Sequence, residues 1–293
     1  MTAKILSGKD IAKEIRAELK TEIEEMKEKH GMTPGLAVAL VGEDPASQVY
    51  VSSKVKTCGK LGVNSIEKRL PEDTSEADLL AIIDEWNNDD KVHGILVQLP
   101  LPKHIDEEKV LLSIRPDKDV DGFHPTNVGK MLIGKPDFLP CTPHGCQQIL
   151  MRSGIETEGK EVVIVGRSNI VGKPLAAMLI QKAKGANATV TICHTRTKDV
   201  KEHTLKADIL IAAAGVPKFI TADMVAEGTV VIDVGVHRIG KTESGKNKLC
   251  GDVDFEAVKE KASAITPVPG GVGPMTITML MTNTVRSAKM RIK

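Results

Sequence analysis

The stretch Glu161–Pro174, EVVIVGRSNIVGKP, decides the fold of this chain. It opens with an unbroken apolar run, Val162–Val165, of the kind found in parallel strands that are buried on both faces. Gly166 follows at once, and glycine lets a backbone turn sharply and approach a ligand closely. The proline falls in the first turn of the next helix, where its missing N–H loses no hydrogen bond. The stretch therefore predicts a strand, a tight loop and a helix N-terminus.

This arrangement can hold the pyrophosphate of a dinucleotide, because backbone N–H groups and the helix dipole both favour an anion there. The loop departs from the usual glycine-rich pattern. Gly166-Arg167-Ser168 stands in place of Gly-x-Gly, and the last glycine, Gly172, comes late. The alternative is an ordinary strand-to-helix turn of an α/β protein, and the stretch alone does not separate the two interpretations.

The composition limits the class of protein. With 293 residues the chain can bury a full core in one large or two medium domains. Its 40 basic and 39 acidic residues nearly cancel, which argues against a nucleic-acid-binding or polybasic membrane surface. Aromatic residues are scarce, with one Trp, one Tyr and four Phe, so we expect an aliphatic core.

Cysteine and histidine usage predicts neither a disulfide framework nor a metal site. The five cysteines include no C-x-x-C pair, and the eight histidines show no H-x-x-x-H spacing. We interpret the cysteines as reduced thiols of a cytoplasmic protein. No apolar run approaches the length of a membrane span and the first residues lack a signal-peptide pattern, so no membrane association is expected.

The order of apolar runs and helix signals predicts an α/β fold with two lobes, the second a Rossmann-like parallel sheet. In the first lobe we expect helices from Ser7, from Pro45 and from about Asp73, and strands at Leu36–Val41, Ser65–Leu70 and Gly94–Leu99. The second lobe continues the opening stretch with strands at Ala188–Cys193, Asp208–Ala213 and Val230–Val234. A final helix is expected at Met275–Met290. The predicted domains are residues 1–143 with 275–293, and residues 144–274.

The segment after the second strand of the second lobe bears on the choice of dinucleotide. Folds that bind NAD usually carry an Asp or Glu there, which meets the ribose 2′-hydroxyl. This chain has the basic, hydroxyl-rich segment His194–Lys198 instead, and Arg167 adds another cation. Cations suit a 2′-phosphate, which a carboxylate would repel. Solvated surface charge is the alternative for Arg196 and Lys198, and the pattern favours NADP over NAD.

Polar residues of the first lobe are candidates for chemistry. Tyr50 and Lys54 are four residues apart on a predicted helix and so share one face. A packed tyrosine and a solvent-facing lysine are the plain alternative. Gln98 lies at the end of a strand that looks buried. Its neutral amide is either a hydrogen-bonding group of the core or a group that orients a ligand.

Two loops carry further signals. Asp117, Asp119 and Asp121 suggest a calcium loop, but the later Glu ligand and the glycine pattern are missing, so no metal is predicted. Pro267–Pro274 has three glycines and a stiff, proline-rich backbone before a helix N-terminus. It suits the wall of a ligand site, and a plain connector between lobes is the alternative.

Seven motifs together resemble the bifunctional methylenetetrahydrofolate dehydrogenase/methenyltetrahydrofolate cyclohydrolase family. They cover essentially the whole chain in the family's order: YVSSK (50–54), GILVQLPLP (94–102), PDKDVDGFHPTNVGK (116–130), PCTPHG (140–145), VVIVGRSNIVGKP (162–174), GDVDF (251–255) and ITPVPGGVGPMT (265–276). The resemblance implies a cytoplasmic homodimer of one-carbon metabolism, with folate in a cleft between the two lobes of each subunit. It further implies oxidation of 5,10-methylenetetrahydrofolate by NADP, followed by hydrolysis to 10-formyltetrahydrofolate.

The resemblance also implies roles for single residues. Lys54 is then the catalytic lysine, tuned by Gln98, while Asp121 anchors the pterin and Tyr50 stacks on the aminobenzoyl ring. The implied substrate-binding residues are Tyr50, Val51, Ser52, Ser53, Lys54, Val97, Gln98, Leu99, Asp121, Pro269, Gly270, Gly271, Val272 and Gly273. The implied cofactor-binding residues are Gly166, Arg167, Ser168, Thr195 and Ile232, to which the charge argument adds Arg196.

Some details depart from the family pattern. Thr195 stands where serine is usual, His237 where asparagine is common, and the loop at 181–187 is slightly longer. Since some relatives prefer NAD, these differences bear on cofactor preference and affinity.

Two other functions remain open. One is an NADP-dependent dehydrogenase for another small substrate, such as a shikimate-type hydroxy acid, which would leave Tyr50, Gln98 and Asp121 without a shared purpose. The other is a non-catalytic nucleotide sensor, against which the intact Lys54 argues weakly.

Overall fold

The apolar run Val162–Val165 lies in β5 (Glu161–Val165) of a computed structural model, which describes residues 2–241, 245 and 247–292. β5 is an interior strand of a parallel sheet, between β6 (Thr189–Cys193) and β7 (Ile209–Ala212). The run is at most 3% exposed, as expected of a strand buried on both faces. The strand predicted from the opening stretch is therefore confirmed.

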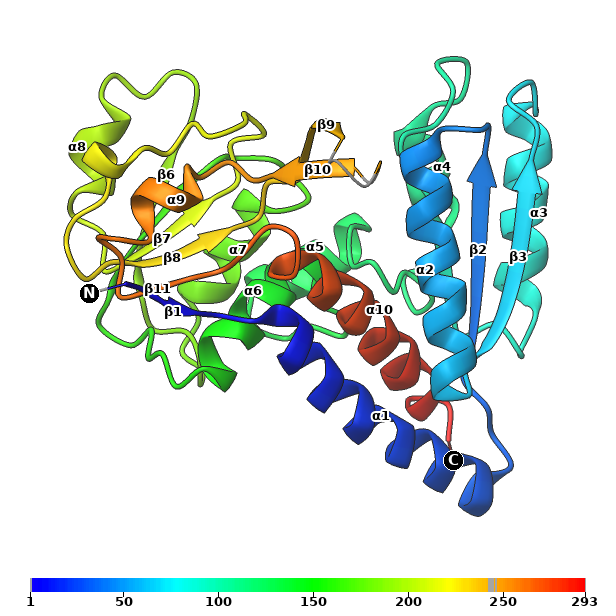
Figure 1. The fold of residues 1–293 in the computed structure, drawn as a ribbon. Coiled ribbons are helices and arrows are strands. Elements are labelled where there is room, and N and C mark those ends of the chain that lie inside the picture. The colour runs from blue at the N-terminus through cyan, green and yellow to red at the C-terminus, as the bar shows by residue number, and fades with distance from the viewer. Residues whose placement is uncertain (1, 242–244, 246, 293) are drawn as a thin grey trace. The chain divides into compact units, whose positions relative to one another are not determined.

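The same sheet contains β8 (Val230–Asp233), β11 (Ala264–Ile265) and β1 (Lys4–Ile5). Among the described residues its strand order is β1-β11-β8-β7-β5-β6, and all neighbouring pairs are parallel (Figure 1). The chain passes from β5 to β6 on one side and then continues with β7 and β8 on the other side. Open α/β sheets bind ligands at such a reversal of direction, at the carboxyl ends of the strands.

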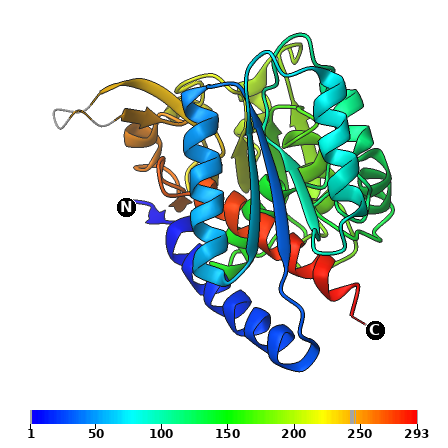
Figure 2. The same ribbon diagram turned by 90° about the vertical axis from the view of Figure 1, so that its right-hand side faces the viewer.

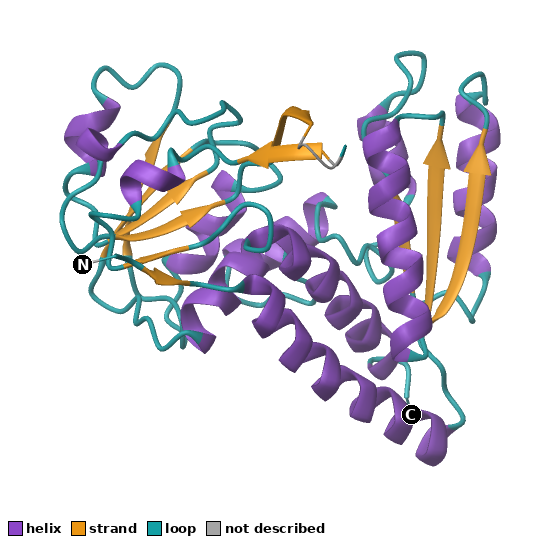
Figure 3. Cartoon of the chain, in the orientation of Figure 1, coloured by secondary structure: helices purple, strands orange, loops and turns teal. Residues whose placement is uncertain are grey.

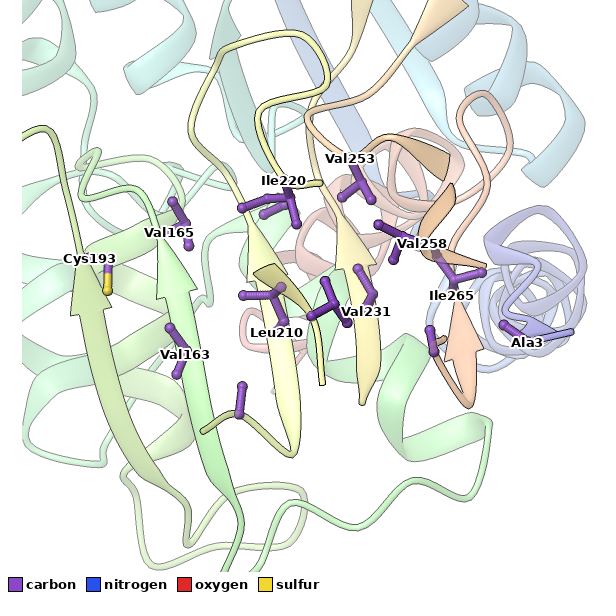
Figure 4. Close-up of a cluster of buried hydrophobic side chains, with 14 residues drawn as sticks. Ala3, Val163, Val165, Cys193, Leu210, Ile220, Val231, Val253, Val258 and Ile265 are labelled. Carbon is purple, nitrogen blue, oxygen red and sulfur yellow. The ribbon is translucent and has the colours of Figure 1, made fainter. Parts of the chain in front are cut away.

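One face of this sheet is covered by an aliphatic core. Val163 and Val165 of β5 lie on that face with Leu210 and Val231 of the neighbouring strands (Figure 4). Ile220 and further apolar residues from the loops close the cluster. The expectation of a core with few aromatic side chains is met here, since Phe255 packs against the cluster only as a partly buried neighbour.

The structure divides the chain into two compact units. Unit 1 comprises the N-terminal residues through Lys13 together with Thr142–Thr276, and unit 2 comprises Glu14–Cys141 together with the C-terminal residues from Ile277. The predicted domains differ from this at the N-terminus, where residues 1–13 were expected in the first lobe. Two-residue strands carry no periodic pattern, so the pairing of Lys4 with Ala264 in β1 and β11 was not visible in the sequence.

Unit 1 also has a β-hairpin that the sequence did not predict. β9 (His237–Lys241) and β10 (Asn247–Cys250) pair antiparallel, with His237 opposite Cys250 (Figure 3). Most of its residues are exposed and polar, so the hairpin lacks the apolar alternation by which strands are recognised. The other helical elements of this unit are α6 (Cys141–Arg152), α7 (Gly172–Leu179), α8 (Val200–Thr204), the 3₁₀ helix η1 (Ala222–Met224) and α9 (Phe255–Val258).

Unit 2 is built on a second parallel sheet. Among the described residues its strand order is β3 (Asn64–Leu70), β2 (Gly35–Val41) and β4 (Gly94–Val97). Helices α2 (Pro45–Leu61) and α3 (Glu76–Asn88) lie on opposite faces of this sheet (Figures 1 and 2). All of these elements were predicted, with ends shifted by a few residues. The fold class expected from the sequence, two α/β units of which one has a Rossmann-like sheet, is thus confirmed.

Two long helices, α1 (Gly8–His30) and α10 (Val272–Lys289), correspond to the helices expected from Ser7 and at Met275–Met290. The stripe of α1 is buried, with no member more than 8% exposed: Ile11, Ile15, Leu19, Ile23 and Met26. Unit 2 has two shorter helices, α4 (Glu107–Ser113) and α5 (Pro125–Leu132), on either side of the predicted aspartate-rich loop.

In the part of the chain that the structure describes, each helix is too short or too polar to span a lipid bilayer. Cys58, Cys141, Cys146, Cys193 and Cys250 are free thiols, as predicted.

His93 gives unit 2 a predictable dependence on pH. Its ring is 4% exposed, and Nδ1 accepts a hydrogen bond from Gly35 N at 2.9 Å. Burial, helped by the charges of Arg291 and Lys118, lowers the pKa of His93 from 6.5 to about 4. Because the folded-state pKa lies below the unfolded one, this stabilisation is fully present above about pH 6.5 and is lost as the pH falls toward 4.

We therefore expect His93 to remove about 3 kcal/mol from the free energy of unfolding between pH 6.5 and pH 4. His93→Gln keeps an acceptor for Gly35 N without titrating in this range, so its stability should fall less. Denaturant midpoints measured across this pH range compare the two proteins, with His104→Gln at an exposed position as control. Parallel pH curves for wild type and His93→Gln would contradict the prediction.

Candidate functional site

Helix α2 sets the positions of Tyr50 and Lys54. Asp44 caps its N-terminus by accepting a hydrogen bond from Ser47 N at 2.7 Å, and Pro45 takes the first helical position. Lys54 is 8% exposed, whereas Tyr50 is 40% exposed. The plain alternative of a packed tyrosine and a solvent-facing lysine is therefore wrong on both counts.

The buried ammonium of Lys54 is hydrogen-bonded to a neutral amide. Lys54 Nζ donates to Gln98 Oε1 at 2.9 Å. Gln98 in turn donates from Nε2 to its neighbour's carbonyl, Leu99 O, at 2.7 Å, which fixes the orientation of the amide. Gln98 is the first residue after β4, and its backbone N still donates to Ala39 O of β2. A strand end therefore presents the oxygen that receives the lysine.

Burial shifts the ionisation of this lysine and of a nearby carboxyl in opposite directions. Desolvation lowers the pKa of Lys54, and the charge of Asp121 opposes that shift. Desolvation raises the pKa of Asp121, opposed by the charge of Lys54. Both groups are thus brought closer to their neutral forms, the condition under which a lysine can exchange protons near neutral pH.

The three aspartates of the loop after α4 have different surroundings. Asp117 forms ion pairs with Arg115 and Arg291 on the surface. Asp119 is 1% exposed and accepts hydrogen bonds from the backbone of the same loop and from a neighbouring amide, at Gly122 N, His124 N and Asn127 Nδ2. Asp121 alone interacts electrostatically with Lys54. The structure therefore singles out Asp121 as the chemically available carboxyl.

The loop next to Asp121 is held by residues that sequence reasoning missed. Asn283 of α10 donates to Val120 O and Leu139 O, both at 2.8 Å, and the Cys141 thiol donates to Val120 O at 3.4 Å. Cys141 is 1% exposed, and burial raises the pKa of its thiol well above the usual value. Their positions, over 140 residues apart for Asn283 and Leu139, gave no local signal.

A buried lysine, Lys118, holds the other end of the loop and was also missed. It is 1% exposed and donates from Nζ to Trp86 O and Asp89 O, each at 2.8 Å, at the C-terminus of α3. Desolvation, with the nearby charges of Arg291 and Arg115, lowers the pKa of Lys118 to about 8. Its ammonium completes the last turn of the helix, so its role is structural.

The predicted substrate-binding residues are divided between the units. Residues 50–54, 97–99 and 121 lie in unit 2, whereas 269–273 lie in unit 1. Within unit 2, Ser52 and Leu99 are exposed, but Val51 is fully buried and Val97 is 9% exposed, so these two valines pack in the interior. The structure thus brings Lys54, Gln98 and Asp121 together within one unit.

In unit 1 the loop after β5 has no room for side chains at two positions. Gly166 has φ of +133°, and a Cβ there would lie 2.0 Å from Ala213 O. A Cβ on Gly172 would lie 2.1 Å from Gly166 O. The late glycine noted in the sequence is therefore required for the loop to close on itself at the start of α7.

The loop between these glycines exposes polar groups beside a helix N-terminus. Arg167 and Ser168 are both exposed, and Ser168 Oγ accepts a hydrogen bond from Val171 N at 3.1 Å. Val171, the N-cap of α7, makes no side-chain cap. Backbone N–H groups and the helix dipole at this point favour a bound anion.

The basic segment after β6 forms a compact turn. His194 N donates to Thr197 Oγ1 at 2.9 Å, and Arg196 N donates to His194 Nδ1 at 3.1 Å. Thr195, Arg196 and Lys198 are exposed. The turn therefore displays hydroxyl and cationic groups from a fixed backbone at the carboxyl end of β6.

Two other predicted regions provide backbone more than side chains. Ile232 of β8 is fully buried, so it does not display its side chain to a ligand. In the segment 269–273, Gly270 has φ of +107°, and a Cβ on Gly271 would lie 2.6 Å from Pro267 O. Gly270 O also accepts a hydrogen bond from Lys9 N at 2.9 Å, which ties the segment to α1.

Among the described residues, no group of three or more His, Cys, Asp and Glu is placed to hold a metal ion.

Comparisons with known proteins find matches to the sequences of both units. The family model for the tetrahydrofolate dehydrogenase/cyclohydrolase catalytic domain matches residues 6–121, and that for the NAD(P)-binding domain of the same family matches residues 140–292. The bifunctional protein FolD of Syntrophobacter fumaroxidans is 62% identical over 293 residues, covering 100% of this chain and 99% of that relative.

Solved structures extend the likeness to three dimensions. The bifunctional FolD methylenetetrahydrofolate dehydrogenase/cyclohydrolase of Campylobacter jejuni is 52% identical with a TM-score of 0.92, covering 99% of both chains. The Trypanosoma brucei enzyme, solved with NADP cofactor and inhibitor, is 36% identical with a TM-score of 0.94, covering 100% of this chain and 99% of that one. The resemblance read from the motifs is confirmed, and the chain belongs to the tetrahydrofolate dehydrogenase/cyclohydrolase family.

Proposed function

We propose that this protein oxidises 5,10-methylenetetrahydrofolate with NADP⁺ and then hydrolyses the methenyl product to 10-formyltetrahydrofolate. The observation that carries the proposal is the buried Lys54, whose Nζ donates to Gln98 at 2.9 Å beside Asp121. A member of this family needs such a proton-exchanging group for the hydrolysis. The reaction supplies formyl groups for one-carbon metabolism, including purine biosynthesis.

The oxidation needs positioning more than proton transfer. Loss of hydride from the methylene carbon leaves a cation that is stabilised by the adjacent nitrogens, so holding the carbon against the acceptor is the main task. NADP⁺, when bound, supplies the hydride acceptor. Gly166, Arg167 and Ser168 would hold its phosphates, and Ile232 is assigned to the same site from the family resemblance. The N-terminus of α7 suits this role because the backbone N–H groups and the dipole of a helix N-terminus favour a bound anion.

The hydrolysis needs protons moved. Water adds to the methenyl carbon and loses a proton, which leaves a hydroxyl on that carbon. The bond from the carbon to N5 then breaks as N5 gains a proton, and the hydroxyl loses its proton to become the formyl carbonyl. One proton is released overall, because a cation and water give a neutral formyl product. Neutral Lys54 can take the first proton, and its ammonium form can return one to N5. Gln98 holds the amine in place while leaving it free to change charge.

Substrate recognition is assigned to side chains that remain available. Asp121 offers carboxylate oxygens to the ring N–H and amino group of the pterin, a pairing of matched geometry. Tyr50 is 40% exposed and has an aromatic face for the aminobenzoyl ring. Exposed Leu99, just after β4, and exposed Ser52 of α2 add contacts, while Val51, Ser53 and Val97 support them. For the segment Pro269–Gly273 of unit 1, which includes Gly270, Gly271 and Val272, a role in folate binding is proposed from the family resemblance alone.

The exposed turn after β6 supports NADP as the cofactor in preference to NAD. Thr195 and Arg196 present a hydroxyl and a guanidinium from a fixed turn, and Arg167 lies in the phosphate loop. These donors match a 2′-phosphate, and Thr195 keeps the hydroxyl of the usual serine.

We further propose that the protein acts as a homodimer in the cytoplasm, without nucleic-acid or membrane partners. The family supports the dimer, and free cysteines support a reducing compartment. Sedimentation should give a mass of twice the 31.5 kDa chain. A monomer at micromolar concentration would contradict the assignment.

One assay separates this function from its rivals. The protein is mixed with methylenetetrahydrofolate and NADP⁺ or NAD⁺, and methenyl absorbance is followed as it rises and then decays. A hydroxy-acid dehydrogenase or a nucleotide sensor would give no methenyl signal with either cofactor, and that result would refute the proposal.

Substitution of the buried lysine should separate the two activities. In Lys54→Gln, cyclohydrolase activity should fall at least about 100-fold, the usual scale for loss of a general acid/base, while part of the dehydrogenase activity persists. Because burial lowers the pKa of Lys54, the wild-type cyclohydrolase rate should change with pH below the ordinary lysine range, and the variant should lack that limb. Lys60→Gln, exposed on the same helix, is the control. Equal loss of both activities would contradict the division of roles.

Removal of one guanidinium should test the cofactor assignment. Arg196→Ala should raise the KM for NADP⁺ about tenfold, the scale of one hydrogen bond to a charged group, and leave the KM for NAD⁺ nearly unchanged. Lys184→Ala removes an exposed charge elsewhere in unit 1 and serves as control. An equal effect on both dinucleotides would remove Arg196 from the 2′-phosphate site.

A further inference from the structure

Two buried carboxylates lie at the ends of strands in unit 1 and have no role in the chemistry above. Asp233 ends β8 and is 3% exposed, and Asp252, two residues after β10, is fully buried. Asp233 accepts three backbone hydrogen bonds, from Gly235 N, Asp252 N and Val253 N, at 2.9 to 3.0 Å. Its carboxylate is therefore satisfied by main chain and fixes the segment that contains Asp252.

Asp252 joins two loops that follow different strands. Its Oδ2 accepts a hydrogen bond from Gly215 N at 2.9 Å, in the loop after β7. Its Oδ1 lies 2.6 Å from His237 Nε2, at the start of β9 and just beyond β8. The His237 side chain is 20% exposed, whereas that of Asp252 is fully buried. A single carboxylate thus holds the loop after β7 to the segment after β8.

The space around these carboxylates is closed. A Cβ on Gly235 would lie 2.2 Å from Asp252 Oδ1, and a Cβ on Gly251 would lie 1.8 Å from Asp233 Oδ2. Both glycines lack positive φ, so packing rather than backbone conformation requires them. A buried carboxylate in such a site depends on the donors that face it, and His237 is the side-chain donor to Oδ1.

The core anchors Asp252 from behind. Asp252 O accepts from Ile220 N, and Asp254 N donates to Ile220 O, both at 2.9 Å. The intervening Val253 points into the apolar cluster beside Ile220 (Figure 4). Asp252 is therefore a fixed point, and the loop at Gly215 takes its position from it.

The location of this network indicates what it acts on. β7 and β8 lie on the side of β5 opposite to β6, whose turn carries Arg196. In an open α/β sheet a dinucleotide lies across the ends of the strands, centred on the phosphate loop after β5. With the 2′-phosphate half over β6, as in the proposed function, the nicotinamide half falls at the ends of β7 and β8.

We propose that His237 is a positioning residue for the nicotinamide half of the dinucleotide, acting through Asp252 on the loop at Gly215. The proposal rests on the proposed function for the orientation of the cofactor. Arg196 and His237 then have different effects. Arg196 distinguishes NADP from NAD, whereas His237 affects binding of the nicotinamide half, which both dinucleotides share.

The test compares a variant without a donor with one that keeps a donor. His237→Leu leaves Asp252 Oδ1 without its side-chain donor, while His237→Asn offers an amide N–H in its place. We expect His237→Leu to weaken binding of NADP⁺ and NAD⁺ alike, by about tenfold, the scale of a hydrogen bond to a charged group. His237→Asn should restore most of the affinity. Lys248→Leu, exposed on the same hairpin, is the matched control.

Calorimetric titration of each protein with NADP⁺ and NAD⁺ measures binding without folate, so failure of the proposed folate chemistry does not obscure the result. Steady-state kinetics add whether KM or kcat changes. Unchanged affinity in His237→Leu, equal loss in the Leu and Asn variants, or a loss confined to NADP⁺ would each overturn the proposal. If thermal unfolding shows that His237→Leu is not folded, His237→Ala replaces it, since alanine removes the donor without adding an apolar group beside the carboxylate.

Discussion

The burial of one ammonium group, that of Lys54, is the constraint on which the candidate site of unit 2 depends. A side chain that is 8% exposed must find inside the protein the hydrogen bonds that it gave up in water. Gln98 supplies an acceptor at 2.9 Å. It can do so because β4 ends one residue earlier, at Val97, and because the side-chain amide of Gln98 is held in place by its hydrogen bond to Leu99 O. The hydrogen bond of this one side chain thus links the end of strand β4 to one face of helix α2.

The identity of the direct partner decides what the lysine can do. A carboxylate at 2.9 Å would stabilise the ammonium and oppose the loss of a proton. A neutral amide accepts the same hydrogen bond and adds no charge, so desolvation remains the larger effect and lowers the pKa of Lys54. Asp121 acts from the side and opposes this shift only in part. The arrangement keeps the lysine ordered in both charge states, which a proton-exchanging group requires.

Local patterns predicted most of the fold, and long-range contacts explain the rest. The run Val162–Val165 and the helix stripes are properties of neighbouring residues, so the sequence alone identifies them. β1 exists only because Lys4 pairs with Ala264, and Asn283, near the C-terminus, donates a hydrogen bond to the loop that contains Asp121. Lys54 and Gln98 were identified by motif, but the sequence could not say that the lysine is buried. The motif also identified Asp121, although nothing in the loop's composition separates this residue from Asp117 and Asp119.

The same physical device makes loops in both units rigid enough to carry function. Asp119 and Asp233 are buried carboxylates that collect backbone N–H groups from the turns around them. Such a carboxylate replaces the hydrogen bonds that a helix or strand would provide, so the backbone is fixed without regular structure. Asp121 follows Asp119 by two residues, and Asp252 lies in the segment that Asp233 holds. A loop ordered in this way can hold a reactive or positioning group at a defined point, since the cost of ordering the loop is met by the folding of the unit rather than by the binding of a ligand.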